Sequence, residues 1–372
     1  MIDFFTYFVY TGLLFSLIIL ANLRSSTNHD EQLYLTRNNF RIEYFFSVLL
    51  ISFIVGFRYD VGNDWAGYLA DFNNIKFNTF LTFEDQYYEF AFFYINKIIP
   101  QLGLSYHWMF FSVAFISWYF LYKSLPNKLI PLFIFFIFTT EYFFWSMNGI
   151  RQFVALTIWI YSITFIIKRE KYYYFLFLFI ASLFHTSSVF LILFYFLPLK
   201  YNRKLFLILF LVSVFIGSTD YILLFFFKIL SLLSIIIPVI EPYLRYLDFT
   251  KILINSDLNY GLGYFFIVIV NFLLLLFSEA VIKKYSSSKI YFLLFAIGTV
   301  IFNLSSNIFI IGRINTYLLF IKTIVLAYTF FYYWNFKKYR FFVIVSLLLF
   351  IFFFYAAIYN SSNMCSPYQF LI

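Results

Sequence analysis

The sequence predicts an all-α polytopic integral membrane protein. Hydrophobic residues make up 63% of the 372-residue chain and charged residues only 12%, whereas a soluble domain carries roughly 25% charged residues. Apolar runs of about 20 residues recur along the whole length, as a helix requires to cross roughly 30 Å of hydrocarbon. Because these runs are continuous rather than short and alternating, they indicate membrane helices and not a transmembrane barrel.

The apolar runs predict about ten full spans. They are expected near 4–23, 42–57, 104–122, 129–146, 150–167, 205–219, 263–282, 290–307, 315–334 and 341–358. No basic segment precedes the first run and no small-residue cleavage site follows it, so a retained helix is expected rather than a signal peptide. No repeat or soluble segment interrupts the spans, and a single domain over residues 1–372 is therefore expected.

The basic residues predict the orientation. Seventeen of the 26 Lys and Arg residues lie on one side, in loops at 24–41, 123–128, 168–171, 200–204, 283–289 and 337–340. Only five acidic residues lie in or next to these loops, namely Asp30, Glu31, Glu43, Glu170 and Glu279. Because positive residues gather in cytoplasmic loops, this side is predicted to be cytoplasmic and both termini to face outward. The same rule accounts for the net charge of +9, so nucleic acid is not an expected partner.

Two stretches do not fit a simple crossing. Residues 172–199 are apolar with basic clusters at both ends, and His185-Thr186-Ser187-Ser188 interrupts them. Two short helices that meet at a break near the outer face satisfy both facts, provided that protein or a water-filled cavity surrounds the break. Residues 221–240 would invert every later loop if they crossed the membrane. They are therefore expected to be a half-inserted segment of an external loop at 220–262.

A second external loop, 58–103, opens with a polar segment at the membrane boundary. Ionisable groups beside hydrocarbon are costly and mark functional sites. The spacing of Asp64, Tyr68 and Asp71 predicts a short helix over 64–74 that lies on the membrane. An interfacial helix that only anchors the loop is the alternative, but it explains two aspartates beside an arginine less well. The candidate site residues of this loop are Arg58, Asp60, Asp64, Trp65, Tyr68 and Glu89.

Arg151 is the strongest candidate for an anion site. It lies in the sequence Asn148-Gly149-Ile150-Arg151-Gln152, at the outer start of a span. The free N–H groups and the dipole of a helix N-terminus favour an anion, and a guanidinium adds a bidentate match to phosphate oxygens. The alternative is an arginine that merely extends its side chain to the membrane interface.

Three further outer residues could complete a site. His185, at the predicted helix break, could act as a general base or donate to a phosphate, or it could simply bond a freed backbone carbonyl. Arg313, followed by Tyr317, enters a span from an external loop and could bind the same anion as Arg151. Arg245 in loop 220–262 is another candidate, unless the acidic residues beside it neutralise its charge.

Other kinds of chemistry have no sequence signal. The three histidines are far apart and Cys365 is the only cysteine, so no metal site is expected. No glycine-rich nucleotide loop and no Ser-His-Asp order stands out. An outward-facing enzyme cannot draw on cytoplasmic ATP or nucleotide sugars, so its substrate must arrive already activated. A lipid-linked diphosphate meets that condition, and no cofactor is expected.

Three segments, taken in order, resemble the EpsG-type, Wzy-like polysaccharide polymerases. They are Arg58-Tyr59-Asp60-Val61-Gly62-Asn63-Asp64-Trp65 with Tyr68 and Glu89, then Asn148-Gly149-Ile150-Arg151-Gln152, then Phe184-His185-Thr186-Ser187. Arg313 with Tyr317 resembles a later element of that family. The resemblance implies a bacterial inner-membrane polymerase that joins repeat units of O antigen, capsule or exopolysaccharide. It would act at the periplasmic face on undecaprenyl-diphosphate-linked oligosaccharides, and a partner protein would regulate chain length.

The expected mechanism is metal-independent and inverting. Arg151 and Arg313, with Arg58 or Arg245, would hold the diphosphate and stabilise its charge as it leaves. The general base is expected to be Asp64, Asp60 or His185, with a slight preference for Asp64. The other substrate-binding residues are expected to be Trp65, Tyr68, Glu89, Asn148, Gln152 and Tyr317.

Two other functions remain open at this level. A flippase for lipid-linked oligosaccharides would also need a cationic cavity, although transporters often show related halves and none is visible here. An O-antigen ligase, which moves finished polymer to another acceptor, would share nearly all of the chemistry.

Overall fold

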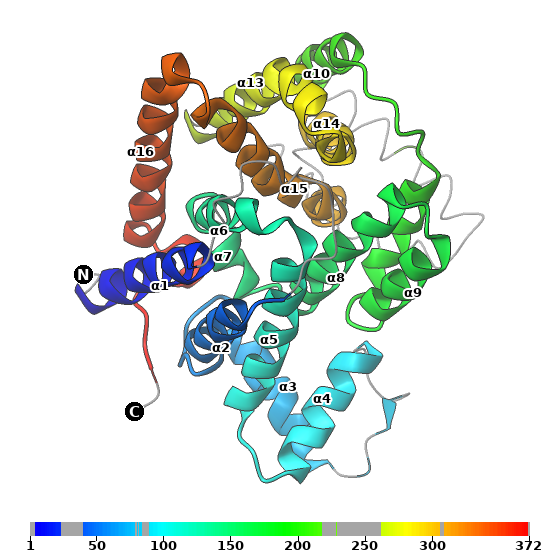
Figure 1. Ribbon diagram of the computed structural model, residues 1–372. Helices are drawn as coiled ribbons and strands as arrows, with labels where there is room; N and C mark the ends of the chain where they lie inside the picture. Colours follow the sequence, from blue (N-terminus) through cyan, green and yellow to red (C-terminus); the bar gives the residue numbers. More distant parts are fainter. Residues whose placement is uncertain are drawn as a thin grey trace. The chain divides into compact units, whose positions relative to one another are not determined.

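The computed structural model describes residues 4–23, 40–78, 80, 82–83, 89–217, 228, 262–305 and 309–370 (Figure 1). Over these residues the protein is helical, and the only β pairing is an isolated bridge between Arg58 and Phe370. The α-helices are α1 (Phe4–Asn22), α2 (Ile42–Gly56), α3 (Trp65–Phe77), α4 (Phe90–Gln101), α5 (Tyr106–Ser124), α6 (Ile130–Thr139), α7 (Tyr142–Ser146), α8 (Ile150–Ile167), α9 (Lys171–Ser182), α10 (Arg203–Gly217), α13 (Leu262–Lys284), α14 (Lys289–Ser305), α15 (Phe309–Trp334) and α16 (Lys337–Tyr359).

The long apolar helices confirm a polytopic membrane protein. A helix or a pair of helices coincides with every predicted span, but the count of ten full spans is not confirmed. Among the described residues, six helices are long and apolar enough to cross a membrane, or seven if a bent pair over Tyr106–Thr139 counts as one span. Helix α2, for example, has 15 residues, which at 1.5 Å per residue extend only about 22 Å.

Two predicted spans differ from the helices observed. The span predicted at 129–146 is broken, because α6 ends at Thr139 and Glu141 adopts a left-handed backbone with φ of 66° before α7 begins. The span predicted at 315–334 begins earlier, at Phe309, because the apolar residues before Gly312 continue the helix. Arg313 therefore lies inside the first turns of α15 rather than in a loop ahead of it.

The predicted break in residues 172–199 is confirmed. Helix α9 ends at Ser182, and a 3₁₀ helix, η3 (Thr186–Phe196), follows with His185 as its N-cap residue. The two short helices pack against each other, so together they supply the protein surroundings that a break in a membrane needs. The half-inserted segment predicted at 221–240 lies outside the described residues.

Contacts within the chain group it into two compact units, residues 1–197 with 330–372, and residues 198–329. In the first unit α8 is the central helix, packed between α5 and α9, while α5 packs on α2 and α2 on α1. Most residues of α8 are buried on every face. Its Trp159 donates to the Tyr174 hydroxyl, and Tyr174 donates to the Leu191 carbonyl at 2.6 Å. This ties α8, α9 and η3 together.

The helices of the first unit place their loops at two ends. Helix α2 ends, α8 begins and α9 ends at one end, where Arg58 bonds the Met147 carbonyl and a side-chain cluster joins residues 89, 151 and 185. The opposite ends of the same helices carry Arg41, just before α2, and the basic residues at 168–171, between α8 and α9. The fold therefore separates the candidate site from the loops that are rich in lysine and arginine.

Candidate functional site

One carboxylate joins two of the predicted site residues. Glu89 Oε2 accepts from Arg151 Nη1 at 2.7 Å, and Glu89 Oε1 accepts from His185 Nδ1 at 2.6 Å. The side chain of Glu89 is only 9% exposed, whereas those of Arg151 and His185 are each 27% exposed. The carboxylate thus lies beneath two basic groups that can be reached from outside. We call these three residues the Glu89 cluster.

Three helix ends build the Glu89 cluster. Glu89 is the N-cap residue of α4, Arg151 lies in the first turn of α8, and His185 is the N-cap residue of η3. Arg151 was predicted at the start of a helix, and α8 does begin there, with Gly149 as its N-cap residue. In this structure the anion that Arg151 binds is the carboxylate of the protein itself.

Glu89 stays ionised in this environment. Burial alone would raise the pKa of its carboxyl, but the hydrogen bond from His185 and the positive charge of Arg151 together hold that pKa below its ordinary value. A carboxylate can only accept hydrogen bonds, so Nδ1 of His185 must carry the hydrogen. The other ring nitrogen, Nε2, is then the one left with a lone pair for a proton.

Aromatic side chains surround Arg151. Burial raises the pKa of the Tyr68 hydroxyl to about 12, against the lowering effect of the positive charge of nearby Arg151. The ring of Phe92 lies 5.5 Å from the guanidinium carbon of Arg151, and it contacts the ring of Tyr68 edge to face. These contacts limit the directions in which the Arg151 guanidinium can point.

Arg58 is turned into the protein. It is fully buried, and its guanidinium donates to the carbonyls of Val55 at 2.6 Å, Val61 at 3.0 Å and Met147 at 2.7 Å. Arg58, expected to lie beside two aspartates and to help hold the diphosphate, instead bonds three backbone carbonyls. Carbonyls at the end of α2 and in the turn before α8 need donors, and Arg58 supplies them.

Residues 58–64, which we call the polar loop, carry two aspartates on their exposed side. Asp60 has a left-handed backbone with φ of 50°, and Asp64 is the N-cap residue of α3. Both residues are exposed, and neither carboxylate forms an ion pair with a residue that the structure describes. The helix predicted over 64–74 is present as α3, and its position on the membrane stays a prediction.

Asn148 and Trp65 are buried beside this loop. The Asn148 side chain accepts from the Asp64 amide at 3.2 Å and donates to the carbonyls of Phe144 and Asn363. Trp65 is 5% exposed, and the rings of Tyr59 and Tyr106 meet it edge to face. Gln152, next to Arg151 on α8, is also buried.

Two predicted residues belong to the second unit and one lies outside the described residues. Arg313 is an exposed residue of α15, and Tyr317, four positions later, is fully buried. Arg245 falls in the part of loop 220–262 that the structure does not describe. The clamp predicted from Arg151 and Arg313 thus remains a prediction.

The sequence did not reveal the role of the C-terminal segment. Residues 361–370 run along the polar loop, and the amides of Tyr59 and Gly62 donate to the carbonyls of Gln369 and Met364 at 2.9 and 2.8 Å. The predicted topology contained a hint of this pairing, because it placed both the polar loop and the C-terminus on the outer side. The polar run after the last span, from Asn360 to Pro367, was available to pair there.

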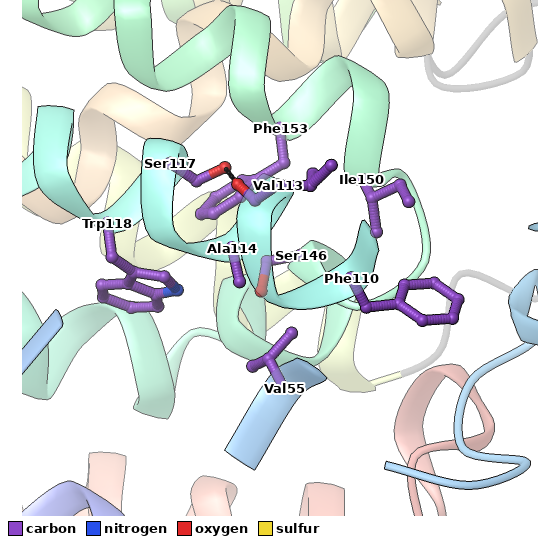
Figure 2. Close-up of a pocket in the computed structure, with 9 residues that line it drawn as sticks. All are labelled: Val55, Phe110, Val113, Ala114, Ser117, Trp118, Ser146, Ile150 and Phe153. Atoms are coloured by element: carbon purple, nitrogen blue, oxygen red, sulfur yellow. Dashed lines mark hydrogen bonds between the residues drawn. The ribbon is translucent and has the colours of Figure 1, made fainter. Parts of the chain in front are cut away.

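A small cavity lies between α2, α5, α7 and α8 (Figure 2). Its lining is largely apolar, and the hydroxyl of Ser117 is already bonded to the Val113 carbonyl. The cavity leaves room for no more than about one water molecule. A sugar or a diphosphate cannot enter this cavity.

Gly62 is required where the polar loop passes Asn148. Its φ is +103°, and a Cβ at this position would lie 2.8 Å from Asn148 Oδ1. We expect Gly62→Ala to lower stability by about 1–3 kcal/mol, through backbone strain, whereas Gly67→Ala in α3 should raise stability by up to about 1 kcal/mol. Nothing lies within 4 Å of a Cβ at Gly67. Thermal denaturation in detergent measures both, and equal midpoints for the two variants would contradict the tight passage.

No group of three or more His, Cys, Asp and Glu side chains is arranged to hold a metal ion over the residues described.

The comparisons with known proteins give one match. A family model described as the EpsG family matches residues 41–370, a range that contains the whole Glu89 cluster. No curated protein and no solved structure matches the chain.

Proposed function

The chain belongs to the EpsG family, and from this premise we propose that it is a polysaccharide polymerase. It would be a membrane glycosyltransferase that joins undecaprenyl-diphosphate-linked oligosaccharide repeat units. The observation that carries the proposal is the Glu89 cluster, in which one buried carboxylate holds an arginine and a histidine that are both partly exposed. An anion-binding group and a proton acceptor side by side are what transfer from a diphosphate requires.

The periplasmic face is the proposed place of the reaction. The Glu89 cluster lies at the ends of α8 and α9 that are opposite to their basic loops at 168–171. By the positive-inside rule those basic loops face the cytoplasm. A site at the other end meets lipid-linked substrates after they have crossed the membrane, in the bacterial inner membrane.

Arg151 is proposed to bind the diphosphate of the donor. Its guanidinium matches two phosphate oxygens, and charge on those oxygens grows as the bond to the sugar breaks. The electron pair of the breaking bond between the anomeric carbon and oxygen stays with the diphosphate. Arg313 and Arg245 are further candidates for the same anion.

His185 is proposed as the general base. Because Glu89 holds Nδ1–H, the Nε2 atom can take the proton from the acceptor hydroxyl as that oxygen attacks the anomeric carbon. The new glycosidic bond forms on the side opposite to the departing diphosphate, so the configuration inverts. We favour His185 over Asp64 and Asp60, since neither aspartate carboxylate forms an ion pair with a described residue, whereas a 2.6 Å hydrogen bond fixes the histidine ring.

The exposed polar loop is proposed to receive the sugars. Tyr59 is 42% exposed and stands beside Trp65, and aromatic rings of this kind stack on sugar rings. Asp60 and Asp64, both exposed on the same loop, can accept hydrogen bonds from sugar hydroxyls.

Purified protein supplied with lipid-linked repeat units should form a ladder of longer chains, and EDTA should leave the rate unchanged. A cationic clamp made by arginine supplies the charge stabilisation without a metal ion. The products are read by gel electrophoresis of the released glycans. Products that need a different acceptor would indicate a ligase, and unchanged repeat units moved across a vesicle membrane would indicate a flippase. Loss of the ladder in EDTA with recovery in magnesium would contradict the metal-free proposal.

A further inference from the structure

The C-terminal segment, residues 361–370, is bonded to the polar loop along its length. Besides the amides of Tyr59 and Gly62, the Asn63 amide donates to the Asn363 carbonyl at 3.3 Å. Together with the bridge between Arg58 and Phe370, these bonds connect the two stretches of chain as a short antiparallel pair. The loop that precedes α3 therefore depends on residues about 300 positions later for its path.

Helices α1 and α2 hold the segment in place. The Tyr368 amide donates to Thr6 Oγ1 at 2.8 Å, and its hydroxyl donates to the Ile54 carbonyl at 2.7 Å. Tyr10 donates to the Cys365 carbonyl. Tyr368 is 1% exposed and Cys365 is fully buried, so the segment is part of the packed interior and not a loose tail.

Asn148 connects three stretches of the chain at one point. Its Oδ1 accepts from the Asp64 amide, and its Nδ2 lies 3.1 Å from the Asn363 carbonyl. Asp64 stands four residues before Tyr68, and Asn148 stands three residues before Arg151. Tyr68 and Arg151 lie together in the site, where the ring of Phe92 contacts Tyr68 and lies 5.5 Å from the guanidinium carbon of Arg151. The relative position of these two residues therefore depends on hydrogen bonds around Asn148, which include the C-terminal segment.

The buried side chain of Arg58 connects the same stretches of chain. Its guanidinium donates to the carbonyls of Val61 in the loop and Met147 in the turn before α8. The central guanidinium carbon, Cζ, lies 4.4 Å from the centre of the Phe110 ring. A lysine in its place has a single ammonium group and cannot spread donors over carbonyls on three sides.

We propose that residues 361–370, acting through Asn148, are a positioning element of the Glu89 cluster: they hold the polar loop so that Tyr68 meets Arg151. The inference rests on the proposed function for its kinetic consequence, but not for its geometry. The segment does not touch the substrate. Its removal lowers the rate of reaction because Arg151 loses the neighbour that orients it, and orientation of a binding group by about 1 Å changes rates by on the order of 100-fold.

The test combines a spin label with a kinetic assay. A nitroxide is attached to Asn63→Cys, which is exposed, while native Cys365 is buried and should remain unlabelled. A label on Tyr172→Cys, a 79% exposed residue of α9, is the matched control. Two perturbed proteins are compared: a chain that ends at Asn360, and the full chain with Thr6→Val and Tyr368→Phe, which lacks two hydrogen bonds of the segment but keeps its packing.

We expect both perturbations to make the label at position 63 more mobile, to leave the label at 172 unchanged, and to lower kcat at least tenfold. The double variant decides the matter if the shortened chain does not fold. A label at 63 with unchanged mobility in the folded double variant, or full activity of that variant, would overturn the proposal. Failure of the proposed function is seen separately, as no polymer from any protein while the difference in mobility persists.

Discussion

Replacing Arg151 by lysine is expected to lower the rate of polymerisation by roughly 10²–10³-fold, the loss typical of removing one preorganised charge-stabilising donor from an active site. The side chain of Arg151 bonds Glu89 through one nitrogen and lies beside Tyr68 and Phe92. A lysine keeps the positive charge and can still pair with Glu89. It cannot hold Glu89 and Tyr68 in this geometry and also present a planar pair of donors to a phosphate.

The measurement is the initial rate of chain growth from lipid-linked repeat units, at saturating substrate, with purified protein. Arg340→Lys is the matched control, since Arg340 is an exposed arginine of α16 that bonds the Trp334 carbonyl within the basic loop. We expect the control to retain the rate of the native protein. Equal rates for Arg151→Lys and Arg340→Lys would remove Arg151 from the site.

Much of the helical framework follows from hydropathy and charge. The run from Ile150 to Ile167 is apolar between a glycine and a basic cluster, and α8 has these bounds. The break near His185 could be predicted too, because a run with basic clusters at both ends cannot cross the membrane once. Hydropathy could not show the break at Glu141, since a single polar residue is tolerated in many membrane helices and only the backbone shows that it turns here.

The members of the site were easier to predict than their partners. Arg151 and His185 stood out because charged and polar groups near hydrocarbon are rare. That Glu89 would join them depends on how α4, α8 and η3 pack, which sequence spacing does not encode across 62 and 96 positions. Arg58 illustrates the reverse case. A charged residue at a membrane boundary looked like a ligand, but it satisfies the carbonyls left free by the ends of two helices.

Removing the imidazole of His185 is the second change with a large expected effect. His185→Ala should lower the rate by roughly 10²–10⁴-fold, the usual contribution of a positioned general base. Glu89→Gln should lower it on the order of tenfold. The amide oxygen of a glutamine can still accept from Nδ1, so the imidazole ring keeps its orientation. The negative charge of Glu89, which stabilises the protonated ring, is lost.

The two changes should not add. Glu89 acts on the proton transfer through His185, so the double variant should be little slower than His185→Ala alone, as expected of residues that work as a unit. His107→Phe is the control, because His107 is a buried histidine of α5 that lies parallel to Phe57 and Tyr106 and a phenylalanine can keep that stacking. Fully additive losses would mean that Glu89 serves Arg151 and not the histidine. A native rate for His185→Ala would return the role of base to Asp64 or Asp60, whose carboxylates lie on the exposed side of the polar loop.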